Sequence, residues 1–78
     1  MTQSLATLAP GQTATVCGFS KENNITQRLL QLGIIEGERI DVVRRAPAGD
    51  PIEIRILGYS LSLRSTEAEI ILVTLHEL

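Results

Sequence analysis

Aromatic residues are nearly absent from this sequence of 78 residues, which has one Phe, one Tyr and no Trp. Proteins that bind nucleic acids neutralise phosphates with a basic surface, and those that bind single strands also stack bases on aromatic side chains. Here nine acidic residues outnumber seven basic ones, so the net charge is −2. Both shortages argue against a nucleic-acid-binding protein, and the core must be built from aliphatic side chains.

Cysteine and histidine occur once each, as Cys17 and His76. A single thiol excludes an intramolecular disulfide and fits a reducing compartment. A nucleophilic cysteine needs a base and an orienting group, and a structural metal site needs three or four convergent ligands. We therefore expect no catalytic residues, no cofactor and no defined metal site. Weak association of Fe²⁺ with scattered carboxylates stays open.

Long apolar runs are also missing. No segment approaches the roughly 20 apolar residues of a membrane-spanning helix. The first ten residues contain neither the basic stretch nor the apolar stretch of a secretory signal. We expect a cytoplasmic protein with one domain over residues 1–78, which does not insert into a membrane and reaches one only through a partner.

Short segments in which apolar and polar residues alternate predict a mainly β protein. Strands are expected at residues 13–19, 39–45, 52–56, 59–64 and 70–75. Turns with glycine or proline separate them, and a short helical turn at 65–69 precedes the last strand. About five short strands with such tight turns are typical of a small, strongly bent barrel.

One segment, residues 24–33, has the spacing of apolar residues that predicts a helix of two turns after the first strand. Asn24 is expected to cap its first turn. Gly33 is expected to end the helix in a left-handed conformation, with Ile34 packing back on Leu29. So short a helix is not stable alone, so we expect its apolar stripe to pack on the sheet.

The loop at residues 46–51, with the sequence APAGDP, is the first candidate for a binding surface. Pro47, Gly49 and Pro51 explain it as a hairpin connection, because they fix or permit the bends of the backbone. The two prolines also stiffen the loop, and a rigid, exposed, partly apolar loop loses little entropy when it binds a partner. The residues alone leave both interpretations open.

Arginine residues flank this loop in the predicted barrel. Arg44 and Arg45 end the strand before it, and Arg64 ends a later strand. An arginine fork binds carboxylates bidentately, so these side chains are candidates for contacts with an acidic partner surface. The alternative is a solvated face on which arginines alternate with glutamates.

Four ordered motifs resemble those of the ferrous iron transport protein A family, FeoA. They are L..L..G....V at residues 5–16, RL..LG...G at 28–37, APAGDPI at 46–52 and L.LR..EA.I..V at 61–73. Together they cover nearly the whole chain. Ala48 stands where a larger apolar residue such as leucine is expected.

The resemblance implies an SH3-like β-barrel and a small cytoplasmic accessory protein of bacterial ferrous iron uptake, without catalytic residues. The implied partner is a FeoB-type membrane transporter, on whose cytoplasmic GTP-binding part the protein would dock, modulating GTP-dependent activity or assembly. The residues expected to contact this partner are Pro47, Asp50 and Pro51, supported by Arg44, Arg45 and Arg64, with Leu32, Gly33 and Ile34 at the helix end as further candidates.

Two other functions stay open. The chain could be the SH3-like domain of an iron-dependent transcriptional regulator, although a metal sensor needs a cluster of His, Glu and Cys ligands that the sequence does not show. It could also be a small barrel that binds nucleic acid, against which its charge and its few aromatic residues argue. Exposed barrel edges also allow a homo-oligomer.

Overall fold

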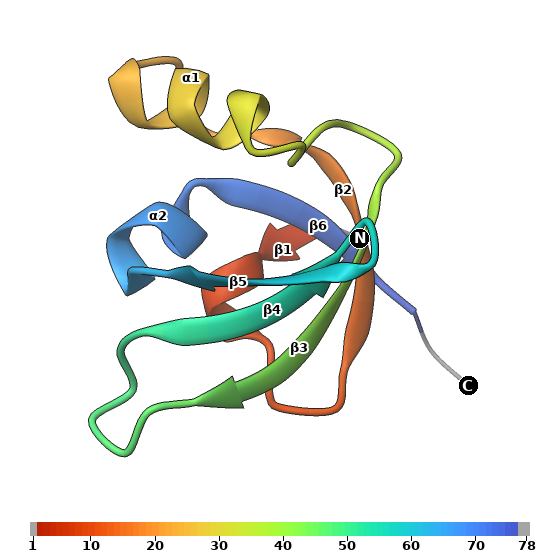
Figure 1. Cartoon of the computed structure of the whole chain (residues 1–78). Helices are drawn as coiled ribbons and strands as arrows, with labels where there is room; N and C mark the ends of the chain where they lie inside the picture. Colours follow the sequence, from red (N-terminus) through yellow and green to blue (C-terminus); the bar gives the residue numbers. More distant parts are fainter. Residues whose placement is uncertain (1, 77–78) are drawn as a thin grey trace.

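The computed structural model describes residues 2–76, and its centre is one antiparallel sheet of six strands in the order β1-β6-β2-β3-β4-β5. The strands are β1 (Thr2–Ser4), β2 (Thr13–Phe19), β3 (Arg39–Arg45), β4 (Ile52–Ile56), β5 (Tyr59–Leu63) and β6 (Ile71–Leu75). The helices are the 3₁₀ turn η1 (Leu5–Thr7), α1 (Asn24–Gln31) and α2 (Ser65–Glu69). The sheet curls strongly, and α1 lies at one end of it (Figure 1). The mainly β class is confirmed, and each predicted strand agrees within one residue.

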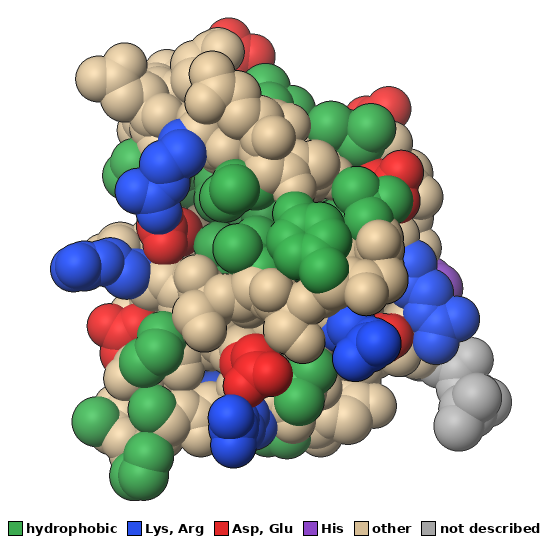
Figure 2. All heavy atoms as spheres, in the orientation of Figure 1, with side chains coloured by type: hydrophobic (Ala, Val, Ile, Leu, Met, Phe, Trp, Pro, Cys, Tyr) green, Lys and Arg blue, Asp and Glu red, His purple; other side chains and the backbone are tan. Residues whose placement is uncertain are grey.

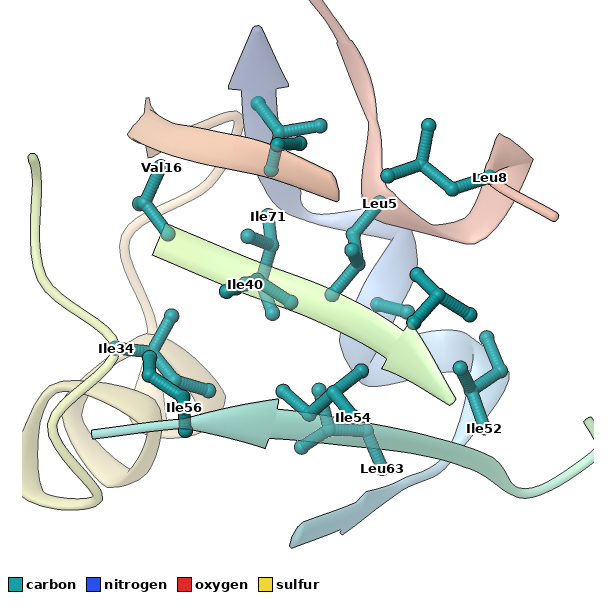
Figure 3. Packing of buried hydrophobic residues seen from close by; sticks show 14 of the residues in the cluster. Leu5, Leu8, Val16, Ile34, Ile40, Ile52, Ile54, Ile56, Leu63 and Ile71 are labelled. Atoms are coloured by element: carbon teal, nitrogen blue, oxygen red, sulfur yellow. The ribbon is translucent and has the colours of Figure 1, made fainter. Parts of the chain in front are cut away.

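The interior is aliphatic, as the shortage of aromatic residues required. Figure 3 shows Leu5, Ile40, Ile54 and Ile71, which come from four different elements, pointing into one cluster. Each of these four side chains is fully buried. Burying one aliphatic side chain of this size stabilises the fold by about 1.5–3 kcal/mol. The alternating pattern of the sequence is therefore what closes the sheet around its core.

The first strand, β1, was not predicted from the sequence. It has three residues without an apolar alternation, and it pairs with β6, with Thr2 opposite Thr74. The buried side chains of Leu5 and Leu8 hold the adjoining segment against the core. The sheet therefore has six strands, where the sequence predicted about five.

Asn23 caps the first turn of α1, where the sequence analysis expected Asn24. The Asn23 side-chain oxygen accepts hydrogen bonds from the backbone N–H groups of Ile25, at 2.9 Å, and Thr26, at 3.2 Å. Asn23 has the extended backbone of a capping residue, whereas Asn24 is already helical. Both residues suit a cap by type, so the sequence alone did not separate them.

The other end of α1 follows the prediction. Gly33 has φ of +95°, and the N–H of Ile34 donates to the carbonyl of Leu29 at 3.1 Å, which is the bond of a Schellman ending. Leu29 and Ile34 are fully buried and anchor the helix to the core. Within residues 2–76, no helix has the length and apolar composition needed to cross a membrane.

Candidate functional site

A groove of about 450 Å³ opens where β3 leads into β4. We call it the β3–β4 groove, and its lining residues are Arg44, Arg45, Ala46, Pro47, Pro51, Glu53 and Ser62. Four of the predicted binding residues, two arginines and two prolines, therefore meet at one place. Glu53 and Ser62 were not predicted as binding residues.

A β-bulge in β3 sets the directions in which the side chains of Arg44 and Arg45 point. The register between β3 and β4 shifts between Val42, which lies opposite Ile54, and Arg44, which lies opposite Glu53. Val43 is the extra residue, and its side chain is exposed. Strict alternation would have placed Arg44 on the same face as Val42; the bulge turns it outward instead.

Arg44 lies at the surface beside the groove. Its Nε donates to Oε1 of Glu53 at 2.7 Å, while 76% of its side chain remains exposed. An exposed ion pair of this kind adds at most about 1 kcal/mol to stability. The pair instead orients the guanidinium group, whose other N–H groups stay available for a ligand.

Arg45 is committed to the fold. Its guanidinium group donates to the carbonyl of Leu8, from Nη2 at 2.8 Å and from Nε at 3.2 Å, and also to the carbonyl of Ala6. These carbonyls belong to Ala6 in the middle of η1 and to Leu8 just after it, in a short 3₁₀ turn that cannot supply donors to its own last carbonyl groups. Arg45 lines the groove, but its guanidinium group is bonded to the N-terminal segment.

Residues 46–51 form a closed loop that walls the groove. The N–H of Ala46 donates to the carbonyl of Pro51 at 3.1 Å, and the N–H of Gly49 donates to the carbonyl of Ala46 at 2.7 Å. Pro47 and Ala48 are exposed, and Gly49 has φ of +87°. Hydrogen bonds and prolines together hold the loop in one shape, so it presents an apolar surface that is already ordered.

Asp50 and Arg64 lie outside the lining of the groove. Oδ1 of Asp50 accepts a hydrogen bond from the N–H of Ser65 at 2.9 Å, so this carboxylate ties the loop to the start of α2. The Arg64 backbone N–H donates to Oε1 of Glu67 at 2.8 Å, and the residue is exposed. Asp50 therefore supports the loop, and Arg64 stays available as a surface cation.

The predicted residues at the end of α1 do not reach the groove. The side chain of Ile34 has no exposed surface, so we withdraw it from the partner-binding candidates. The carbonyl of Leu32 accepts a hydrogen bond from the Tyr59 hydroxyl. A Cβ on Gly33 would lie 2.7 Å from Cδ1 of Leu57. Leu32 and Gly33 thus form a second surface with the β4–β5 turn.

This second surface is apolar, which the sequence analysis did not predict. Leu57 is 58% exposed and Tyr59 is 40% exposed. In Figure 2, hydrophobic side chains gather in the middle of the face, between α1 and the position of β5 in Figure 1. Leu57 directly follows the inward Ile56 and so falls out of the alternating pattern, a signal in the sequence for its exposure, whereas Tyr59 keeps the alternation of β5 and gave none.

One polar contact and the single cysteine lie on the outer face of β2. The Thr15 hydroxyl and Nε2 of His76 form a hydrogen bond. Cys17 is half-buried. Among residues 2–76, no three His, Cys, Asp or Glu side chains lie close enough together to hold a metal ion.

Asp41 lies next to a second, smaller hollow between β3 and the β4–β5 turn. The hydroxyl of Thr13 donates to its Oδ1 at 2.7 Å, and Nε of Arg39 donates to the same atom at 3.2 Å. The Thr13 hydrogen bond lowers the pKa of Asp41 below its ordinary value of 3.8, with smaller contributions from Arg39 and Arg55, while partial burial opposes the change. Asp41 is therefore a structural carboxylate that stays ionised.

The family model that matches this chain is the FeoA domain, over residues 3–75. A curated relative is the Fe(2+) transport protein A/Fe(2+) transporter FeoB fusion protein of Porphyromonas gingivalis, which is 35% identical over 64 residues. That match covers 82% of this chain and 8% of the relative, so the chain corresponds to a small part of the fusion protein.

Solved structures agree with the family match. A FeoA-like protein of Clostridium acetobutylicum has a TM-score of 0.93 and 35% identity, covering 99% of this chain and 90% of that one. FeoA of Stenotrophomonas maltophilia, solved in complex with zinc and described as an SH3 domain protein, has a TM-score of 0.81 and 26% identity, covering 92% of this chain and 89% of that one. The expected SH3-like fold is confirmed.

Proposed function

The chain belongs to the FeoA domain family, and from this we propose that it is a small, non-catalytic accessory protein of ferrous iron transport. It is a protein-interaction module that docks on the cytoplasmic GTP-binding part of a FeoB-type transporter. Docking modulates the GTP-dependent activity or the assembly of the transporter. The protein works in the cytoplasm and reaches the membrane through this partner.

The β3–β4 groove is the observation that carries the proposal. Its walls combine the apolar surfaces of Pro47 and Pro51 with the exposed guanidinium group of Arg44. Arg64 adds a second exposed cation at the end of β5. Such a surface fits a partner segment that carries both apolar and acidic side chains. Because the loop is already ordered, binding costs little conformational entropy.

The relative from Porphyromonas gingivalis supports the choice of partner. By its name, that protein joins a transport protein A and a FeoB transporter in one chain. Fusion makes the contact between two modules intramolecular, with effective concentrations that reach the millimolar range. Such an arrangement favours a pair of modules that work in contact.

Charge reversal at Arg44 tests the docking surface. Arg44→Glu removes one attraction to an acidic partner and adds one repulsion, so we expect affinity for the purified GTP-binding domain of the cognate transporter to fall about tenfold. Arg39→Glu is the matched control, because Arg39 is also an exposed β3 arginine paired with an acid but does not line the groove.

Calorimetry measures both affinities, and GTP hydrolysis by the domain is followed in parallel. Wild type and Arg39→Glu should bind alike, with the difference from Arg44→Glu shrinking at high salt. If Arg44→Glu binds as tightly as the control, the groove is not the docking surface.

A further inference from the structure

We propose that the free edge of β5 pairs with β5 of a second copy of this chain, in antiparallel register centred on Leu61. The resulting dimer has a two-fold axis and joins the two sheets into one. This edge shares only Ser62 with the β3–β4 groove. The proposal therefore does not depend on the proposed function.

The hairpin geometry shows which backbone groups the edge offers. A two-residue turn with positive φ, +53° at Leu57 and +82° at Gly58, joins β4 to β5. In such a hairpin the residues flanking the turn form a hydrogen-bonded pair, and every second pair after it does the same. Tyr59, Leu61 and Leu63 thus bond to β4, while the backbone groups of Ser60 and Ser62 point away from it.

Those outward groups have no neighbouring strand within residues 2–76, because β5 ends the strand order. Edge strands are normally protected by charged residues, proline, bulges or short length. β5 has the sequence YSLSL, pairs with β4 without a register shift, and runs for five residues. The opposite edge, β1, is protected by its length of three residues.

The edge is complementary to itself. With Leu61 on the two-fold axis, Ser60 of each copy lies opposite Ser62 of the other. Each of these pairs exchanges both N–H···O=C bonds, and all the outward groups of the two serines are used. The serine side chains are small and exposed, so they leave room on the outer face.

Charges on the outer face are compatible with this register. Ser62 lies opposite Glu53, and Ser60 lies opposite Arg55. Pairing Ser62 with Ser60 of the second copy places Glu53 and Arg55 of different copies in one row, three strand spacings apart. This row pairs opposite signs, whereas Arg64 of each copy lies two strand spacings from Arg55 of the other; at such separations salt largely screens both interactions, so the outer-face charges do not oppose this register.

The same register covers apolar surface. Tyr59, at the end of β5, comes to lie beside the edge of the second copy, opposite the buried Leu63, and the exposed Leu57 lies in the turn just before it. Leu57 and Tyr59 are among the most exposed large hydrophobic residues of the chain. Hydrophobic and uncharged atoms dominate the middle of this face in Figure 2. Apolar side chains beside a bare strand edge are a feature of pairing surfaces.

Paired substitutions at Ser60 and Ser62 test both pairing and register. In S60E/S62K, the glutamate at position 60 of one copy faces the lysine at position 62 of the other across the dimer interface. Within each hairpin, that glutamate lies opposite Arg55 and that lysine lies opposite Glu53. S60K/S62K and S60E/S62E place like charges opposite each other across the dimer interface. By sedimentation velocity over a concentration series, we expect wild type and S60E/S62K to dimerise. The like-charge variants should dissociate about tenfold more readily.

Amide hydrogen exchange reports the edge directly. In wild type, exchange at Ser60 and Ser62 should slow as protein concentration rises, while Leu61 and Leu63, bonded to β4, stay protected at every concentration. A wild type that remains monomeric throughout overturns the proposal. So does a dimer whose affinity is the same in all three variants, or protection of the two serines by the transporter domain alone.

Discussion

Arg44 and Arg45 follow one another in β3, yet their guanidinium groups have different surroundings. Arg44 is an exposed side chain held by Glu53, whereas Arg45 donates to the carbonyls of Ala6 and Leu8. The bulge at Val43 separates their roles. A charge reversal meant to probe binding therefore belongs at Arg44, because the same change at Arg45 would also disturb the N-terminal segment.

Truncation of each arginine should separate stability from binding. Arg45→Ala leaves two partly buried carbonyls without donors, so we expect the free energy of unfolding to fall by about 1–3 kcal/mol. Arg44→Ala removes an exposed ion pair and should cost at most about 1 kcal/mol. Urea unfolding followed by circular dichroism measures both. Equal losses would show that the contacts of Arg45 do not stabilise the fold.

Asp41 gives the fold a pH dependence with a defined sign. Its pKa is lower in the folded state than in the unfolded chain, mainly through the hydrogen bond from Thr13. Its contribution to stability is therefore complete above the unfolded value of about 4 and is lost as the pH falls through the lower folded value. Thr13→Val should remove most of this contribution.

The check is urea unfolding of wild type and Thr13→Val from neutral pH down to acid. The difference between their unfolding free energies should be largest at neutral pH and shrink below about pH 4. Thr74→Val, a similar exchange at an exposed strand position, should show a difference that does not vary with pH. A constant difference for Thr13→Val would mean that Asp41 is not its partner in solution.

Among the elements, α1 depends on a few contacts. Eight residues are too few for a stable isolated helix. Besides the buried Leu29, two polar contacts hold it: Arg28 forms an ion pair with the buried Glu67 of α2, and the Tyr59 hydroxyl donates to Leu32. These contacts join the middle of α1 to α2 and its C-terminal end to β5.

Removing both polar contacts should loosen α1 and leave the sheet intact. In Arg28→Ala/Tyr59→Phe we expect amide exchange across α1 to accelerate about thirtyfold, since two contacts worth about 1 kcal/mol each are removed together. The β4 amides should not change. Arg39→Ala, which removes an ion pair away from α1, serves as control. Unchanged exchange in α1 would show that the core residues alone fix the helix.

Strand positions and the Schellman ending of α1 were predictable because they depend on local patterns of apolar residues and on glycine. The strand β1 was not, because Thr2–Ser4 becomes a strand only through its pairing with β6. The bulge at Val43 was not predictable either, since it exists only in the register between β3 and β4. Local sequence patterns predict where strands and helices lie, whereas the pairing between strands decides their register and the position of the bulge.

The candidate site was predictable in part for the same reason. The stiff loop and the two arginines could be found from residue types, and four of the predicted residues do line the groove. Its other side, Glu53 and Ser62, comes from two strands that only the register brings beside Arg44. The burial of Ile34 follows from core packing, which residue type alone does not reveal.

At the scale of the whole molecule, two surfaces are proposed to contact other proteins. The β3–β4 groove combines prolines with an exposed arginine, and the free edge of β5 offers unpaired backbone groups. Ser62 lies at their meeting point. A dimer formed through β5 would therefore bring the grooves of two copies onto one continuous sheet.

Docking through the groove is tested most directly by an NMR titration of labelled protein with the GTP-binding domain of its cognate FeoB-type transporter, with and without a GTP analogue. We predict saturable shifts of the amides of Arg44, Ala46, Glu53 and Ser62, and small shifts in β1 and around His76. Saturable shifts confined to other surfaces, or no shift at domain concentrations in the high micromolar range typical of weak contacts, would contradict docking through the groove.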